Sequence, residues 1–229
     1  MLPFIKKGKT SQDFSKLPVG KKGLFNPSLA PGNVAIYDGD VNCSSASWQD
    51  RTGANQITFF NAPTYNAAGL NGHGTILFDG TTQYGTDTIF NLNLPLTYYL
   101  VVKQITWFNS DNIFRLIGGS YNYIQMTSVQ RIRLIDNDSH SIFNDQMAIG
   151  NWGIITVVIN GLNSMIRVDL TDGVFGTITD PTITGISIPN SVVGNTGNIE
   201  VAYLILRNSA DANFLQNNFI LWLKNRFAI

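Results

Sequence analysis

The chain has 229 residues, and its 44% hydrophobic content predicts a globular body and excludes a disordered chain. Charged residues make up only 13%, about half the roughly 25% of an average soluble domain. The single cysteine, Cys43, excludes an intramolecular disulfide and a cysteine-based metal cluster, and we expect a buried, unreactive thiol. No segment approaches the roughly 18 apolar residues of a membrane span, so no membrane partner is expected. The N-terminus has no apolar run after its lysines, so we expect no signal peptide.

The formal net charge of zero conceals an uneven distribution along the chain. Residues 1–33 hold six lysines against one aspartate, a charge of +5, which leaves −5 for the rest. Proline and glycine are frequent there and oppose helix or strand, so we expect an extended arm over 1–33 and a folded body over 34–229. A solvated tail and a partner-docking arm are both open, and nucleic-acid binding is disfavoured because the arm has no arginine. The candidate docking residues are Phe4, Lys6, Lys7, Lys9, Phe14, Lys21, Lys22 and Phe25.

The body consists of short strand-like runs separated by turn residues. The expected strands are 34–37, 75–78, 96–103, 113–117, 121–126, 131–135, 153–159, 166–170, 183–188 and 197–206. Residues 46–53 are expected to form a loop, and Asn160-Gly161 and Asp172-Gly173 are expected to end strands. About ten strands with such turns predict an all-β, two-sheet antiparallel jelly-roll sandwich.

The C-terminus changes from a strand pattern to a helical one. A helix at about 210–226 is predicted by four apolar residues that share one helical face, Leu215, Phe219, Trp222 and Leu223. Ser209 or Asp211 is expected to cap its start, and Lys224 and Arg226 suit its negative end. We expect the helix to cover an open sheet edge or one end of the sandwich.

Four short stretches lie in a fixed order along the body, Trp48–Gly53, Ile76–Gly80, Asn151–Trp152 and Gly197–Tyr203. With the terminal helix, they resemble the concanavalin A-like lectin/glucanase superfamily, in its laminin-G/pentraxin-like branch found in phage and other virion proteins. The resemblance covers roughly residues 34–229. It implies a two-sheet jelly roll, often glycan binding, sometimes bound calcium, and in virions a fibre, spike or decoration role. Fold likeness does not fix function, because ligand-binding loops diverge on one sandwich.

Catalysis is disfavoured by the scarcity of suitable side chains. Glu200 is the only glutamate, whereas glucanases of the resembled superfamily use a Glu-x-Asp-x-Glu strand, and retaining hydrolysis needs two carboxylates roughly 5 Å apart. We therefore expect Glu200 to make a polar contact near a strand end and the protein to have no catalytic residues. The two histidines, His73 and His140, lie in turn-like sequence, which disfavours a Ser-His-Asp triad and a zinc site.

Calcium is the one cofactor that the sequence leaves open. It requires several oxygen ligands, and the densest candidate is the pair Asp136 and Asp138, followed by the segment Asp38-Gly39-Asp40. Turns are rich in aspartate and asparagine for backbone reasons alone, so a plain turn is the alternative at both places.

Sugar binding requires an exposed aromatic ring, which stacks on the apolar face of a sugar, with amides nearby. The best-placed candidates are Trp107, Tyr121, Asn122 and Tyr123. Strand alternation puts Tyr121 and Tyr123 on one face, and core packing is the alternative for each ring. The other three tryptophans are expected in the core: Trp48, Trp152 and Trp222.

Together with the uneven charge of the arm and body, the resemblance implies a non-enzymatic virion structural or decoration protein with a lectin-like domain. Its expected partners are other virion proteins, held through the arm, and host surface glycans. It would be assembled in the host cytoplasm, and a homo-oligomer is expected because such assemblies are usually symmetric. A soluble carbohydrate-binding module is the alternative, and a glycoside hydrolase is the least favoured reading.

Overall fold

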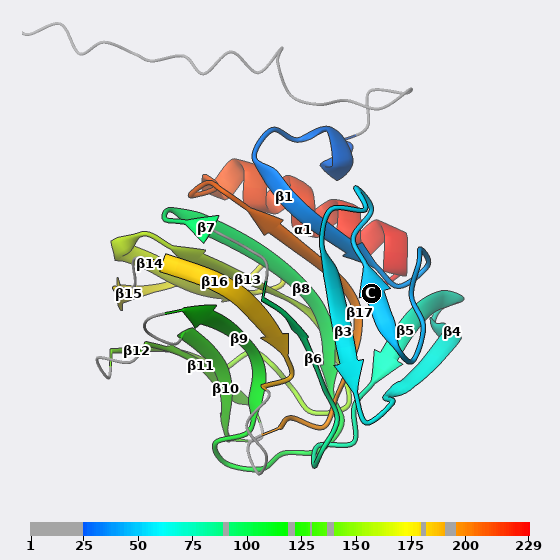
Figure 1. Ribbon diagram of the computed structural model, residues 1–229. Coiled ribbons are helices and arrows are strands. Elements are labelled where there is room, and N and C mark those ends of the chain that lie inside the picture. The colour runs from blue at the N-terminus through cyan, green and yellow to red at the C-terminus, as the bar shows by residue number, and fades with distance from the viewer. Residues whose placement is uncertain are drawn as a thin grey trace, which may run out of the picture.

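The computed structural model describes residues 25–88, 92–118, 122–128, 130–136, 140–179, 182–190 and 196–229. They form two antiparallel sheets packed face to face, with one α-helix on the outside of the described part (Figure 1). The predicted all-β sandwich with a C-terminal helix is therefore confirmed. All the candidate docking residues of the arm except Phe25 lie outside the described ranges.

One sheet has eight strands, in the order β15-β14-β13-β8-β17-β5-β4, with β1 also paired to β17. Its strands are β1 (Asn33–Asp38), β4 (Thr64–Leu70), β5 (His73–Leu77), β8 (Leu96–Gln104), β13 (Trp152–Ile159), β14 (Gly161–Val168), β15 (Val174–Ile178) and β17 (Ile199–Arg207). The long strand β17 is central, because it pairs with β8 along its length, with β5 near its start and with β1 towards its end. Every residue of β17 is buried, which explains its nearly continuous apolar sequence.

The other sheet has nine strands, in the order β12-β11-β10-β9-β16-β6-β3-β2, with β7 also paired to β16. Its strands are β2 (Ser47–Gln49), β3 (Gln56–Phe60), β6 (Tyr84–Asp87), β7 (Leu92–Asn93), β9 (Asn112–Gly118), β10 (Asn122–Ser128), β11 (Arg131–Ile135), β12 (Ser141–Asn144) and β16 (Thr182–Ile188). Strands β3 and β11 alternate exposed or half-buried residues with buried ones. Such alternation is typical of a sheet with one face on the core and one towards solvent.

The space between the sheets is filled by a single apolar cluster to which both contribute. Trp48 is 1% exposed and packs beside Tyr37, and the ring of Tyr98 lies 4.8 Å from that of Phe114 across the two sheets. The predicted core position of Trp48 is confirmed. One polar pair is buried here as well: the hydroxyl of Tyr37 donates to Asp87 Oδ2 at 3.0 Å.

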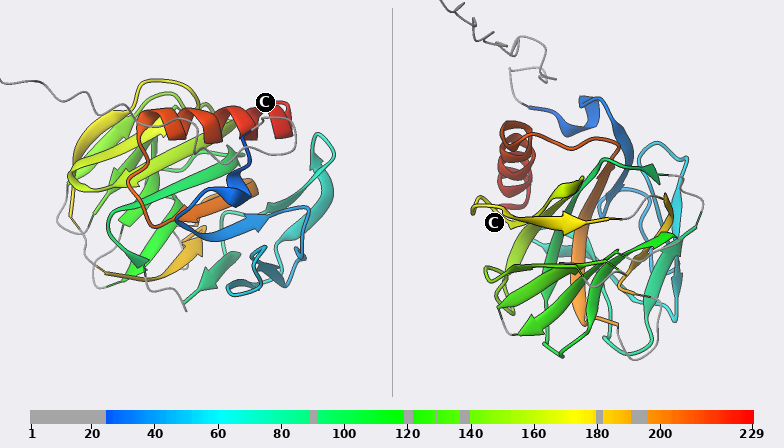
Figure 2. Two further views of the ribbon diagram at one scale, coloured as in Figure 1. Left: turned by 90° about the horizontal axis from the view of Figure 1, so that it is seen from above. Right: turned by 90° about the vertical axis from the view of Figure 1, so that its left-hand side faces the viewer.

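A second apolar cluster lies on the other side of the eight-stranded sheet, under helix α1 (Asn213–Phe227). Figure 2 shows the helix lying along the outer face of this sheet. Phe219 is fully buried, and its ring stacks on Tyr99 at 4.6 Å and meets Phe25 edge-on at 4.9 Å. Trp152 and Trp222 are half-buried in this cluster. The helix therefore covers a sheet face, and the expectation of an edge or an end was wrong.

The start of the helix also differs from the prediction. The N-cap residue is Ala212, and no side chain makes a capping hydrogen bond. Asp211 and Ser209 are not caps because the Asp211 carboxylate accepts hydrogen bonds from the Ser209 hydroxyl and from Arg207 Nε, each at 2.6 Å. At the other end, Lys224 and Arg226 lie in the last turn as predicted.

Several strands were not expected from the sequence. The predicted loop 46–53 contains the short strand β2 before its turn at Gly53, which has a φ of +79°. Strands β3, β4, β6, β7, β12 and β15 were also missed. The predicted strand 166–170 ends earlier, at Val168, because Asp169 adopts a left-handed φ of +52°. Among the described residues, no helix has the length and apolar character needed to cross a membrane.

Candidate functional site: the open face of the nine-stranded sheet

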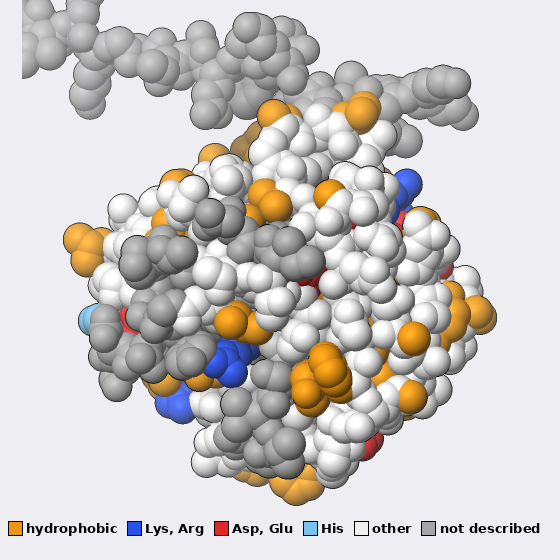
Figure 3. Space-filling view, in the orientation of Figure 1, with side chains coloured by type: hydrophobic (Ala, Val, Ile, Leu, Met, Phe, Trp, Pro, Cys, Tyr) orange, Lys and Arg blue, Asp and Glu red, His pale blue; other side chains and the backbone are white. Residues whose placement is uncertain are grey.

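The outer face of the nine-stranded sheet carries no helix in the described part of the chain, and we call it the open face. Figures 1 and 3 view the molecule from this side, and Figure 3 shows a cluster of Lys and Arg side chains between separate apolar patches. Successive residues of a strand point to opposite faces. On β9, Phe114 therefore enters the core while Arg115 points to the open face.

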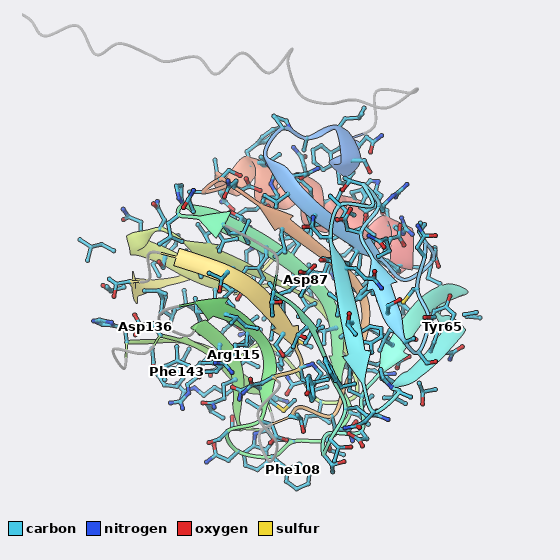
Figure 4. All side chains as sticks on the ribbon, in the orientation of Figure 1. Tyr65, Asp87, Phe108, Arg115, Asp136 and Phe143 are labelled. Atoms are coloured by element: carbon cyan, nitrogen blue, oxygen red, sulfur yellow. The ribbon has the colours of Figure 1, made fainter. Side chains whose placement is uncertain are left out.

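Arg115 and Tyr123 form the centre of the open face. They are cross-strand partners on β9 and β10, and the guanidinium carbon of Arg115 lies 5.4 Å from the centroid of the Tyr123 ring. Nη1 of Arg115 donates to Asn190 Oδ1 at 3.0 Å. The guanidinium is thus held by a cation–π contact with the half-buried Tyr123 and by a hydrogen bond. Arg115, labelled in Figure 4, is only 7% exposed.

A second group lies on β10, β11 and β12. Arg133 donates through Nε and Nη2 to Oε1 of Gln125, and the Gln125 amide donates to the carbonyl of Ser110 at 2.9 Å. Beside it, Arg131 lies 4.6 Å from the ring centroid of Phe143, which is 36% exposed. This end of the face presents an exposed ring together with guanidinium groups and an amide.

The opposite end of the open face carries another aromatic pair. Phe60 on β3 and Tyr84 on β6 stack with ring centroids 4.6 Å apart and planes 17° apart, and Phe60 is 41% exposed. Strands β6 and β10 are three positions apart in the sheet, so the strands that carry Tyr84 and Tyr123 lie roughly 14 Å apart at about 4.8 Å per strand. The rings are thus distributed across the face.

The rim of the sheet is formed by the loop between β8 and β9. Trp107 is half-buried against the core, and its indole Nε1 is buried without a hydrogen-bond partner. Its neighbour Phe108 is 62% exposed (Figure 4), so Phe108 is the ring available to a ligand and Trp107 anchors the loop. In the same loop, burial raises the pKa of the Asp111 carboxyl to about 6.

The predicted ligand residues thus have different outcomes. Tyr123 lies on the open face, Tyr121 lies outside the described residues, and Asn122 contributes only its backbone to the described part of β10. Sequence reasoning missed Arg115, Gln125 and Arg133. Strand alternation could have found them, because a polar residue between apolar neighbours in a strand points away from the core.

The calcium candidate Asp136 is engaged by its own chain. The carboxylate is 3% exposed and accepts hydrogen bonds from the backbone N–H groups of His140 and Thr179, each at 3.0 Å. Burial raises the pKa of this carboxyl, but the bonds from Thr179 and His140 outweigh it and the net pKa lies below the ordinary value. Asp136 therefore ties β11 to the end of β15. Asp138 lies outside the described residues.

The second calcium candidate, Asp38-Gly39-Asp40, belongs to an ion-pair network. Arg226 from α1 donates through Nη2 to Asp38 Oδ1 and Asp40 Oδ2, both at 2.7 Å, and Nδ1 of His73 lies 2.7 Å from Asp40. Burial raises the pKa of Asp40, yet hydrogen bonds from Gly74, His73 and Arg226 hold it below its ordinary value. These contacts fasten the helix end to the sheet. Among the described residues, no three His, Cys, Asp or Glu side chains cluster as metal ligands do.

Glu200 makes the polar contact expected from the sequence. Its carboxylate lies 2.6 Å from Lys103 Nζ and accepts a hydrogen bond from the Thr75 hydroxyl at 2.6 Å. It is 8% exposed and belongs to the eight-stranded sheet. The only glutamate of the chain is therefore engaged by neighbours on the sheet opposite the open face.

Fold and site together define a two-sheet antiparallel β-sandwich with one helix-covered outer face and one polar, aromatic outer face. No protein-family model matches the sequence, and no curated protein matches it. Solved structures do share the fold. Trypanosoma rangeli sialidase matches with a TM-score of 0.67 and 12% identity, over 92% of this chain and 35% of that chain. This chain thus spans about a third of the sialidase.

Two further neighbours correspond more closely in length. Domain 4 of AbnA, an extracellular arabinanase from Geobacillus stearothermophilus solved with arabinotriose, matches with a TM-score of 0.65 and 11% identity, over 82% of this chain and 98% of that domain. The binding domain of botulinum neurotoxin serotype G matches with a TM-score of 0.63 and 14% identity, over 84% of this chain and 51% of that one. At these identities the likeness shows the fold alone.

Proposed function

We propose that this chain is a non-enzymatic glycan-binding β-sandwich and that the open face is its binding surface. The observation that carries the proposal is the distribution of partly exposed rings beside oriented guanidinium and amide groups on one strand-built face. Aromatic rings stack on the C–H faces of sugars, while amides and guanidinium groups hydrogen-bond to hydroxyls. An extended surface of this kind suits a chain of several sugar residues.

The structural neighbours support this class of ligand. The arabinanase domain, nearly all of which matches this chain, was solved with arabinotriose, and a Trypanosoma rangeli sialidase structure was solved with sialic acid. Membership of the concanavalin A-like superfamily, suggested by the sequence resemblance, is part of the same proposal. The identity of the sugar follows from none of these observations, so a broad glycan screen is the first experiment.

The decisive test combines a glycan array with calorimetry of the strongest hit. Tyr123→Ala and Phe60→Ala are expected to weaken binding about 3- to 10-fold each, the worth of one aromatic contact. The matched control is Leu221→Ala, on α1 and away from the open face. It removes an apolar side chain that is 46% exposed, compared with 41% for Phe60. Absence of any hit, or an equal loss in the control, would contradict the proposal.

The absence of hydrolysis is a proposal as well, supported by the engagement of Glu200 with Lys103 and Thr75. Hydrolysis with retention requires a second carboxylate roughly 5 Å away. Incubating the chain with its best glycan ligand and following the ligand by mass spectrometry should leave it intact over days. If freshly purified protein cleaves the glycan and the Glu200→Gln variant does not, the proposal that the chain is non-enzymatic would be overturned.

We also propose where the domain acts. It is carried on a virion, where its N-terminal arm attaches it to another virion protein and several symmetric copies face host glycans. This proposal is supported by the sequence resemblance and by the +5 charge of residues 1–33 against −5 for the remainder. Because Phe25 packs on α1 and Gly32 accepts a backbone bond from Asn208 at 2.8 Å, a deletion should end at residue 24. The truncated chain should fold and fail to join particles, and unchanged incorporation would refute attachment through the arm.

A further inference from the structure

A groove of about 460 Å³ opens on the side of the sandwich that carries the helix. It lies between the first turn of α1 and the hairpin of β14 and β15, on the eight-stranded sheet and away from the open face. Its lining combines one arginine with several amides and an aromatic ring, and the residues that matter are Arg167, Asn160, Asn163, Asn213, Gln216 and Phe175.

Arg167 is the central group of the groove. It projects from β14, is 5% exposed, and donates through Nη1 to Asn213 Oδ1 at 2.8 Å and more weakly to Gln216 Oε1 at 3.5 Å. Its Nε is buried with no hydrogen-bond partner, and within the described ranges no carboxylate lies at ion-pair distance from it. Burial lowers the pKa of this guanidinium. A buried cation whose donors are not all paired is costly, and an entering anion would compensate it.

Two carboxylates line the groove, Asp211 and the exposed Asp172, and neither forms an ion pair with Arg167. The Asp211 carboxylate is already paired with the buried Arg207 at 2.6 Å, so it does not neutralise Arg167. The helix itself has no side-chain cap and no acidic residue in its first turn, and Ala212 and Asn213 line the groove. Its positive dipole end therefore faces the same space. Cross-strand from Arg167, the buried hydroxyl of Thr156 also lacks a partner.

We propose that this groove binds a carboxylate-bearing sugar residue, such as a uronic acid. Arginine matches a carboxylate through paired, charge-assisted hydrogen bonds, and the exposed amides of Asn160 and Asn163 suit sugar hydroxyls. Phe175, which is 69% exposed at the mouth of the groove, offers a ring for stacking on the sugar face. The site stands on these observations alone and does not depend on glycan binding at the open face.

One lining residue makes the sign of the ligand's charge testable. Asp172 is exposed at the groove and raises the pKa of Arg167 through its charge without forming an ion pair with it. A carboxylate ligand is repelled by Asp172, whereas a cationic ligand is attracted and a neutral sugar is indifferent. Asp172→Asn is therefore expected to strengthen binding of an acidic sugar about 2- to 5-fold, the size of a partly solvated charge interaction.

The experiment is a calorimetric titration of the full chain with methyl β-D-glucuronide, D-galacturonic acid and N-acetylneuraminic acid, and with methyl β-D-glucoside as a neutral match. We expect at least one acid to bind and the glucoside to bind about 10-fold more weakly or worse. Arg167→Lys, which keeps the charge and removes the guanidinium fork, should lose about 10- to 100-fold. Phe175→Ala, an exposed position that does not threaten folding, should lose about 3- to 10-fold.

Leu221→Ala, at an exposed position of α1 that does not line the groove, is the control and should leave acid-sugar affinity unchanged. Tyr123→Ala on the open face is measured beside it to locate the binding surface. Thermal melting identifies any variant that fails to fold. Failure of all three acids to bind at millimolar concentration, equal binding of the glucoside, binding of inorganic phosphate alone, or an affinity loss in Tyr123→Ala but not in Phe175→Ala would each overturn the proposal.

Discussion

The two outer faces of the sandwich differ although they flank the same core. The face of the eight-stranded sheet is apolar and tyrosine-rich and is sealed by α1, with Tyr99, Tyr203 and Phe219 fully buried. The open face of the nine-stranded sheet presents partly exposed rings, Tyr123, Phe60 and Phe143, while Arg115 beside Tyr123 is itself 7% exposed. The covered face contributes to stability, and we propose that the open face binds a ligand, so substitutions on the two faces should separate stability from binding.

The largest contrast is expected for phenylalanines on the two faces. Phe219→Ala removes a fully buried ring that stacks on Tyr99 and lies 4.6 Å from the Arg207 guanidinium, and it should lower the free energy of unfolding by about 3–5 kcal/mol. Phe143→Ala on the open face should change it by less than about 0.5 kcal/mol. Urea denaturation measures both, and similar losses for the two variants would show that the faces are not divided as described.

Glu200 tests whether a polar group on the covered sheet is structural. Glu200→Gln removes the charge that Lys103 meets at 2.6 Å, and it should cost about 1.5–3 kcal/mol of unfolding free energy, the usual worth of a hydrogen bond to a charged group. The control is Asp145→Asn, whose side chain is 63% exposed. If Glu200→Gln unfolds at the same urea concentration as the unmodified protein, the Glu200 carboxylate does not stabilise the fold.

The stability of the protein should depend on pH through Asp111, which lies in the loop between β8 and β9. The folded-state pKa of Asp111 is raised from 3.8 to about 6 by burial, so its contribution to stability is fully present below about pH 3.8 and is lost as pH rises through 6. Asp111→Asn should therefore stabilise the protein at pH 7 and should show little gain at pH 3.5. At about 1.4 kcal/mol per pKa unit the shift corresponds to about 3 kcal/mol, which solvent screening of a partly solvated carboxyl reduces to about 1–2 kcal/mol. Melting temperatures of both proteins across this range check the sign, and an equal gain at the two pH values would contradict it.

The smallest effect is expected for the exposed ion pair of the open face. Arg131 and Asp145 are 46% and 63% exposed and 2.7 Å apart, so Arg131→Ala should cost no more than about 1 kcal/mol. The same change should weaken glycan binding, because Arg131 lies over the Phe143 ring. Comparing unfolding in low and high salt with calorimetric affinity for the best glycan separates the two effects. If Arg131→Ala lowers stability without lowering glycan affinity, this end of the open face does not contact the glycan.

The same division of faces explains what could be predicted from the sequence. Strands β8, β13 and β17 are covered on both sides, so they appear as long apolar runs that were recognised. Strand β4 was missed because it is largely exposed at a sheet edge and contains Asn66, Ala67, Ala68 and Gly69, which carry no strand pattern. Strand β3 alternates clearly, and its signal was overlooked.

The candidate sites follow the same rule. Alternation on β10 put Tyr123 on one face of its strand without saying whether that face is the core, and it puts Gln125 on the same face. Arg115 lies on the neighbouring strand β9, where alternation points it away from the core-facing Phe114. Arg167 is different: its strand alternates as a half-buried strand does, which predicts a solvent-facing arginine, yet the residue is 5% exposed. Its burial comes from α1, which begins at Asn213, far along the chain. No local pattern contains that information.

The central position of β17 has a consequence for how the protein acquires its fold during synthesis. Residues 199–207 join β8, β5 and β1, whose own residues lie between 33 and 104. The eight-stranded sheet is therefore incomplete until the ribosome has released β17. Until then β1, β5 and β8 lack β17 as a hydrogen-bonding partner, and unpaired strand edges are prone to aggregate. Contacts this distant in sequence are typical of domains that fold in milliseconds to seconds, so nascent chains that stall before residue 199 are expected to depend on chaperones.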